Sequence, residues 1–374
     1  MTKKDNADNS IRQSNFEFLR IIAMCMIIAM HYMTKGMQIP KLSVDTSLHN
    51  IIFRLLFAFC SSAVNVYVFI SGYFAVDSKW SVSKLIRLWL QVLLYSILIP
   101  VIMNIAGAVD ISSMNLSVKQ QIFLPISYEH YWFATAYVML YLFSPILTAA
   151  IKHLDKKQLG AVIIMTLTVF CGFKSVNPYL IPWDKYGDDV IWFIILYLIA
   201  GYIRMYGIPF FEGSTGVKAT DGTQGQSTGT SDTVRHPGRA LAIYIIFSSL
   251  TFAIAYAASC IVRATGKMEY YMDMTYCYNY ITILIASIGL FYTFKNLNIK
   301  YSAWINRLAG YTFGVYLLHE NITLRELWPR LLGIDSAMGQ WWQFFHMLFC
   351  IIVVFVIGCI VDYLRTYIFG LIRR

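Results

Sequence analysis

Ten apolar segments recur along the chain, and each is near the length of a helix that crosses a lipid bilayer. Such a helix needs about 20 mostly apolar residues. Because the hydrocarbon core offers no water to backbone groups, a spanning segment must form its hydrogen bonds internally, as a helix does. We therefore predict an all-α integral membrane protein, a polytopic bundle of about ten transmembrane helices. The segments cover residues 16–33, 51–75, 84–106, 130–151, 158–174, 189–207, 240–262, 276–294, 303–320 and 342–369.

The composition of the chain supports a membrane protein. Hydrophobic residues make up 58% of the 374 residues and charged residues only 13%, against about 25% in soluble domains. The net charge of +10 fits the excess of Lys and Arg that marks the cytoplasmic loops of membrane proteins. We therefore expect the lipid bilayer as the partner, and we do not expect nucleic acid. The seven cysteines lie mostly inside apolar segments without metal-ligand spacing, so we expect no metal.

The distribution of Lys and Arg predicts the orientation of the bundle. An even number of segments places both termini on one side of the membrane. Of the 30 Lys and Arg residues, nineteen fall on the side of the termini, ten on the other side, and Arg20 lies inside the first segment. Because positive residues concentrate in cytoplasmic loops, we predict a multipass protein of the plasma membrane with both termini cytoplasmic.

The chain divides into a short tail and one membrane domain. Residues 1–15 are predicted to form a cytoplasmic N-terminal tail, and residues 16–374 a single multipass domain. One long connection, residues 212–238, is rich in Gly, Ser and Thr. This composition is typical of a flexible chain, so we predict a disordered cytoplasmic linker there.

The first apolar segment carries three ionisable residues, Glu17, Arg20 and His31. An ionisable group at mid-membrane costs about 2.5–3.5 kcal/mol on insertion scales, so each needs a reason. The eleven-residue step from Arg20 to His31 places both on one helix face, about 16 Å apart along the axis. Glu17 falls on the same face and can pair with Arg20. The pattern fits either a snorkelling arginine with an interfacial histidine, or a polar track with a proton-transfer group at one end.

Further polar residues separate by predicted depth. Imidazoles and carboxylates gather toward the outer side, whereas unpaired cations gather toward the cytoplasm. Glu129 and His130 fit interfacial caps as well as they fit site residues, and Lys84 and Arg87 are more typical of positive-inside anchors than of ligand contacts. The outer set is His31, Glu129, His130, His319, Glu320 and Asn321, and the inner set is Arg20, Lys84 and Arg87.

Four stretches, in the same order along the chain, resemble the acyltransferase-3 family of integral membrane proteins. The first is FLRIIAMCMIIAMHY, which holds the Arg20 and His31 pair at a spacing of eleven residues. The others are VNVYVFISGYF at residues 64–74, YWFATAYVMLYLFSPIL at 131–147 and LAGYTFGVYLLHEN at 308–321. One departure is that members often carry an arginine pair before the third span, where this chain has Lys84 and Arg87.

The resemblance implies an O-acyltransferase. Its members move an acyl group, usually acetyl, from acyl-CoA to a hydroxyl of a surface or lipid-linked carbohydrate. The expected donor is acetyl-CoA, the expected acceptor is such a glycan, and glycan-synthesis machinery is a candidate partner. The sequence leaves the acceptor's identity and the oligomeric state open.

The resemblance also implies roles for individual residues. His31 would act as the general base, because a sugar hydroxyl is a weak nucleophile and histidine titrates in a suitable range. Arg20 would hold a CoA phosphate. For Ser71 and Gly72 the alternative is close helix packing through small residues. The candidate catalytic residues are His31, Arg20, His319 and Glu129, the donor-side residues are Arg20, Lys84, Arg87, Ser71, Gly72 and Tyr73, the acceptor-side residues are Trp132, Tyr316, Glu320 and Asn321, and Thr312 and Gly314 support the site.

The alternative function is a multipass exporter or flippase of a lipid-linked glycan or exopolysaccharide. A buried Arg and His track would also suit a proton-coupled transporter. Such transporters commonly contain inverted repeats with broken spans in corresponding positions, and this sequence shows none. Transfer of labelled acetyl groups to a glycan would separate the two functions.

Overall fold

The computed structural model describes residues 12–37, 39, 47–177, 184–212 and 236–372, and within these ranges the regular elements are helices. Seven helical stretches are long and apolar enough to cross a membrane, and two shorter apolar helices accompany them. This confirms the predicted polytopic bundle. These stretches are α1 (Ser14–Met37), α2 (Leu48–Cys60) with α3 (Ala63–Ala75), α4 (Val82–Ile105), α6 (Trp132–His153), α7 (Lys156–Leu167) with η1 (Thr168–Phe173) and α8 (Lys174–Val176), α9 (Val190–Tyr206), α10 (Pro237–Thr265), α12 (Ile281–Asn296) and α17 (Gln343–Ile372).

The ninth predicted segment, 303–320, is not one continuous helix. It forms α13 (Ala303–Ala309) and the eight-residue α14 (Thr312–His319). Thr312 Oγ1 donates to the Ala309 carbonyl at 2.8 Å, which satisfies a backbone acceptor left over where α13 ends. A helix of eight residues is about 12 Å long, so α14 reaches only partway through a bilayer. The remaining short helices are α5 (Leu116–Phe123), α11 (Glu269–Met274), α15 (Leu327–Leu331) and α16 (Ile334–Ala337).

The predicted tail and linker fall largely outside the described residues. Residues 1–11 of the tail 1–15 are not described, and α1 begins at Ser14. Residues 213–235 of the linker 212–238 are not described either. The linker is followed by α10, whose first turn holds Pro237, a position where proline needs no backbone N–H.

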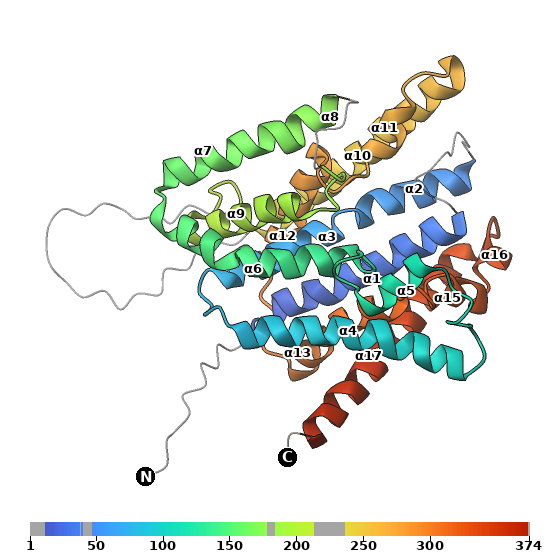
Figure 1. Cartoon of the computed structure of the whole chain (residues 1–374). Coiled ribbons are helices and arrows are strands. Elements are labelled where there is room, and N and C mark those ends of the chain that lie inside the picture. Colours follow the sequence, from blue (N-terminus) through green and yellow to red (C-terminus); the bar gives the residue numbers. More distant parts are fainter. Residues whose placement is uncertain (1–11, 38, 40–46, 178–183, 213–235, 373–374) are drawn as a thin grey trace, which may run out of the picture.

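The helices run side by side, and α1 begins on the same side of the bundle as α17 ends (Figure 1). α1 lies inside the bundle, where it packs against α2, α3, α12 and α17. The outer helices α4, α7, α10 and α17 expose large apolar side chains instead, including Ile105, Ile164 and Phe345. This distribution is typical of helices that face lipid, because lipid tails are as apolar as the side chains they meet.

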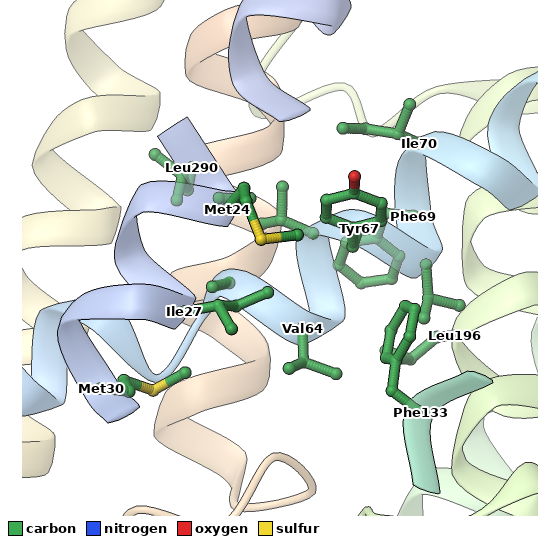
Figure 2. Packing of buried hydrophobic residues seen from close by; sticks show 14 of the residues in the cluster. Met24, Ile27, Met30, Val64, Tyr67, Phe69, Ile70, Phe133, Leu196 and Leu290 are labelled. Carbon is green, nitrogen blue, oxygen red and sulfur yellow. The ribbon is translucent and has the colours of Figure 1, made fainter. Parts of the chain in front are cut away.

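The core around α1 positions the face that carries His31. Met24 and Ile27 of α1 point toward Val64 and Tyr67 of α3 (Figure 2). His31 follows Ile27 by four residues, so the helical repeat places its side chain on the same face. The packing of α1 on α3 therefore fixes the depth and direction of this histidine.

Close contact between α14 and α17 depends on two glycines. A Cβ added to Gly314 would lie 2.4 Å from the Asp362 carboxyl carbon, and one added to Gly358 would lie 2.8 Å from Val315 Cα. Only the absence of side chains lets the two helices approach this closely. The short α14 is thereby held against α17 while its last residue, His319, faces α1.

Candidate active site

Two histidines from distant parts of the chain are in direct contact. His31 Nδ1 lies 2.9 Å from His319 Nε2, and His319 Nδ1 lies 2.7 Å from the Val315 carbonyl oxygen. A carbonyl only accepts, so His319 Nδ1 carries the hydrogen, and in the neutral ring Nε2 is the acceptor. His31 Nδ1 therefore donates to His319. This assignment leaves the lone pair of neutral His31 on Nε2, where it can take a proton.

Glu320 completes a group of three titratable side chains. Its Oε1 lies 3.3 Å from His31 Nδ1 and is buried, with no hydrogen-bond partner among the described residues. Ligand atoms of His31, His319 and Glu320 lie within 4.8 Å of one another, and two imidazoles with one carboxylate form a donor set that suits Zn²⁺. The His31 to His319 distance is that of a hydrogen bond, so we treat the two rings as a hydrogen-bonded pair. The expectation of no metal stays a prediction.

A small aromatic cavity, here called the histidine cavity, lies beside His31. Its volume is about 20 Å³, enough for about one water molecule. Trp132 and Tyr316, both predicted on the acceptor side, line it. The complete lining is Met24, Ile27, His31, Val64, Tyr67, Trp132, Phe133, Tyr278, Phe313 and Tyr316.

A larger cavity, here called the arginine cavity, lies beside Arg20 and has a volume of about 340 Å³. The predicted pair is present: Arg20 Nη1 donates to both oxygens of Glu17, at 2.7 and 2.9 Å. Arg20 also lines the cavity, and 24% of its side chain is exposed. The complete lining is Arg20, Ser71, Phe74, Ala75, Ser78, Trp80, Tyr137, Leu140, Tyr141, Ser144, Pro145, Thr148 and Tyr197.

Residues of α3 and α6 connect the linings of the two cavities. Ser71 lines the arginine cavity and donates to the backbone carbonyl of Tyr67, which lines the histidine cavity. Tyr137 lines the arginine cavity, donates to Ser71 Oγ at 3.2 Å and stacks on Phe133 of the histidine cavity. Residues that line one cavity are therefore in direct contact with residues that line the other.

The family model Acyl_transf_3, described as an acyltransferase domain, matches residues 13–363. The chain is a member of the acyltransferase-3 family. The match runs from α1 into α17 and confirms the resemblance drawn from the four sequence stretches. Membership and the apolar helices together make the protein a multipass membrane acyltransferase, which argues against the exporter. No curated protein and no solved structure matches this acyltransferase-3 chain.

Two predicted donor-side residues of this acyltransferase-3 protein have packing contacts instead of facing the arginine cavity. A Cβ on Gly72 would lie 2.9 Å from Ala200 Cβ, which matches the small-residue packing alternative. The Tyr73 hydroxyl accepts from Arg204 Nη1 at 3.2 Å, and its ring stacks on Phe16. Of the three donor-side residues in this stretch, Ser71 is the one that lines the cavity.

Three other predicted site residues lie away from both cavities. Lys84 and Arg87 are exposed in the first turns of α4, and Arg87 Nε donates to the Ser83 carbonyl. Glu129 is half exposed and pairs with Lys185 at 2.7 Å. None of the three lines the arginine cavity or the histidine cavity.

Asn321 and the predicted interfacial His130 organise the chain after α14. Asn321 is fully buried, and its Nδ2 donates to the Tyr95 carbonyl and to the Tyr131 hydroxyl. His130 Nε2 accepts from the Ile322 backbone N–H at 2.9 Å. These bonds fix the segment that directly follows His319 and Glu320, so both residues position the site from outside it.

Thr312 and Gly314, predicted to support the site, position α14, whose last residue is His319. Tyr67 and Thr312 share a hydrogen bond, and because Thr312 donates to Ala309, Tyr67 is the donor. The sequence reasoning did not assign Tyr67, Tyr137 or Tyr278 to the site. The chain contains 26 tyrosines, and no spacing marks these three.

Proposed function

We propose that this acyltransferase-3 protein transfers an acetyl group from acetyl-CoA to a hydroxyl of a carbohydrate, with His31 as the general base. The observation that carries the proposal is the hydrogen bond from His31 Nδ1 to His319, which leaves Nε2 of a partly exposed ring as the proton acceptor. A positioned base contributes about 10²- to 10⁴-fold to such a reaction.

The chemistry balances with this one base. His31 Nε2 takes the proton of the sugar hydroxyl while that oxygen attacks the thioester carbonyl carbon. The carbon–sulfur bond then breaks, the acetyl ester remains on the sugar, and His31 returns the proton to the departing thiolate of CoA. During the step His31 is a cation, and the Glu320 oxygen 3.3 Å from its Nδ1 stabilises that charge.

His319 orients the base. Its own tautomer is fixed by the Val315 carbonyl of the preceding helical turn, so its Nε2 presents a lone pair to His31. This arrangement resembles other catalytic sites in which a third group holds the base in one tautomer.

Arg20 is the proposed anchor for a phosphate of the donor. Both of its bonds to Glu17 use Nη1, so the N–H groups of Nε and Nη2 remain for a phosphate. A volume of about 340 Å³ falls in the usual range for ligand sites and suits a pantetheine arm. The arm would run along α1 toward His31, a distance of about 16 Å.

The distribution of Lys and Arg supports a proposed orientation with both termini cytoplasmic in the plasma membrane. Arg20 then lies on the side that holds acetyl-CoA, and His31 lies nearer the outside. The acceptor is then a surface or lipid-linked glycan, and proteins of glycan synthesis are the candidate partners.

The test is acetyl transfer by the purified protein. The full chain in detergent is incubated with labelled acetyl-CoA and candidate glycans, and the acetylated glycan is measured. We expect His31→Gln to reduce turnover at least about a hundredfold. His153→Gln, an exposed histidine at the end of α6, is the matched control and retains activity. Turnover by His31→Gln close to that of the unaltered protein would refute the role of His31.

A further inference from the structure

A third cavity, here called the tyrosine cleft, opens beside α11 and is the largest of the three. Its volume is about 670 Å³, within the range of ligand sites in proteins. Figure 1 places α11 at the end of the bundle opposite the start of α1. The cleft is lined by Phe57, Tyr186, Asp188, Glu269, Tyr270, Asp273, Met274, Tyr276, Cys277 and Tyr278.

Tyr278 belongs to both the tyrosine cleft and the histidine cavity. Trp132, which lines only the histidine cavity of the two, stacks on Tyr278 with ring centroids 5.8 Å apart and an interplanar angle of 20°. One tyrosine side chain therefore forms the boundary between the large cleft and the cavity that holds His31.

The backbone that carries Tyr278 is held firmly. Its carbonyl accepts from Asn65 Nδ2 at 2.8 Å, and Asn65 is fully buried. The next residue, Asn279, donates to Asp184, which pairs with the buried Lys174. These bonds hold the main chain at Tyr278 in place, and the stacking on Trp132 holds its ring at the boundary between the two cavities.

The loop before α9 closes against the same backbone. Gly187 has a φ of +89°, and a Cβ there would lie 2.9 Å from Tyr278 Cβ. A side chain at this position would clash with Tyr278, so glycine is needed for the loop to pack against the residue that bounds both cavities.

The lining of the cleft indicates the kind of ligand that it binds. Tyrosine rings offer flat apolar faces with a polar edge, which suit the C–H face and the hydroxyls of a pyranose ring. Carboxylates accept hydrogen bonds from sugar hydroxyls. Three carboxylates line the cleft, and among its described lining residues there is no lysine or arginine. Burial raises the pKa of Asp188 to about 7, and Lys174 Nζ lies 4.2 Å from the ring centroid of Tyr186. The lining therefore has a small net negative charge, which disfavours ligands with carboxylate, sulfate or phosphate groups.

We propose that the tyrosine cleft binds the acceptor, a sugar without negative charge, stacked on tyrosine rings. Tyr278 positions the reacting hydroxyl of that sugar toward His31. The inference rests on the proposed function, since it assumes that the acceptor is a carbohydrate. It adds the location of the acceptor site, the charge of the sugar and the residue at the boundary.

The test measures binding, so it is independent of catalysis. The full chain in nanodiscs is titrated with two probes, a neutral trisaccharide of N-acetylglucosamine and a trisaccharide of galacturonic acid, and binding is followed by saturation-transfer NMR. We expect the neutral probe to bind at least about tenfold more tightly. Equal affinity for the two probes, or no binding of the neutral one, would overturn the inference.

Substitutions locate the binding. Tyr270→Ala and Tyr278→Ala should each weaken binding of the neutral probe about tenfold, and Tyr278→Phe should restore it because the ring face remains. Tyr301→Ala, at a tyrosine that is 65% exposed and outside the cleft, is the matched control. A thermal unfolding midpoint unchanged in Tyr278→Ala excludes a folding defect. Unchanged affinity in both cleft variants contradicts the proposal.

The proposed function and this inference fail in different ways. His31→Gln should keep most of its affinity for the neutral trisaccharide, because the cleft residues hold the sugar ring and His31 does not line the cleft. Loss of turnover in His31→Gln with probe binding outside the cleft would retain the acyltransferase mechanism and reject the cleft. Probe binding in the cleft together with full activity of His31→Gln would retain the acceptor site and reject His31 as the general base.

Discussion

Arg20→Ala removes a guanidinium that serves both Glu17 and the arginine cavity. Its Nη1 donates to both Glu17 oxygens, and its other N–H groups remain for a donor phosphate. A hydrogen bond to a charged group contributes about 1.5–3 kcal/mol, so loss of one such contact should lower the affinity for acetyl-CoA about ten- to a hundredfold. Arg20→Lys should recover only part of that affinity, because lysine lacks the planar fork of the guanidinium.

The pairing with Glu17 adds an effect on stability that must be separated from donor binding. Only 6% of the Glu17 side chain is exposed, so Arg20→Ala leaves a buried carboxylate without its partner. Breaking a buried pair costs about 3–5 kcal/mol, and the partial exposure of Arg20 should reduce that cost. The double variant Glu17→Gln/Arg20→Ala also removes the carboxylate's charge. It should therefore regain stability without regaining donor affinity.

The assay is a donor titration with acetyl-CoA and with acetyl-pantetheine, which has no nucleotide phosphates. We expect Arg20→Ala to weaken acetyl-CoA binding much more than acetyl-pantetheine binding. His31→Gln should show the opposite pattern, with donor affinity retained and turnover lost for both donors. An equal loss of affinity for both donors in Arg20→Ala would refute the phosphate role. Arg20 would then act through Glu17 alone.

Two further predictions concern the histidine pair and the orientation. His319→Ala should reduce turnover about ten- to a hundredfold with unchanged donor affinity, because it removes the acceptor that fixes the His31 tautomer. A kcat close to that of the unaltered protein would contradict this role of His319. His319→Gln should lose less, because its amide oxygen can accept the same bond. The orientation is tested in a variant in which the exposed Cys260 is replaced. In it, Ser78→Cys should react with an impermeant maleimide only from the cytoplasmic side, and Ser113→Cys only from outside. The reversed pattern would invert the assigned sides.

The sequence could predict features that depend only on short separations along the chain. The lengths of the apolar segments follow from the thickness of the bilayer, and the structure has helices at those places. The pairing of Glu17 with Arg20 follows from a three-residue spacing on one helix. The common face of Arg20 and His31 follows from the helical repeat in the same way.

Other features were decided by packing between distant segments. The break between α13 and α14 lies in a stretch that is apolar enough to read as one span, and hydrogen bonds from Thr312 to Ala309 and from Tyr67 to Thr312 stabilise it. Lys84 and Arg87 share the predicted depth of Arg20, yet they lie exposed on the outer helix α4. The sequence could not predict this, because the depth of a residue in the membrane does not specify whether its side chain faces the core of the bundle.

The amino-acid sequence by itself determined the membrane bundle, the family and the polar face of the first helix. Only the tertiary structure decided that His31 meets His319, 288 residues away, and that Tyr278 lies between two cavities. The physical reason is that helix geometry fixes the relation of residues within a few turns. The relation of residues on different helices depends on how small residues such as Gly314 and Gly187 let the surrounding segments approach.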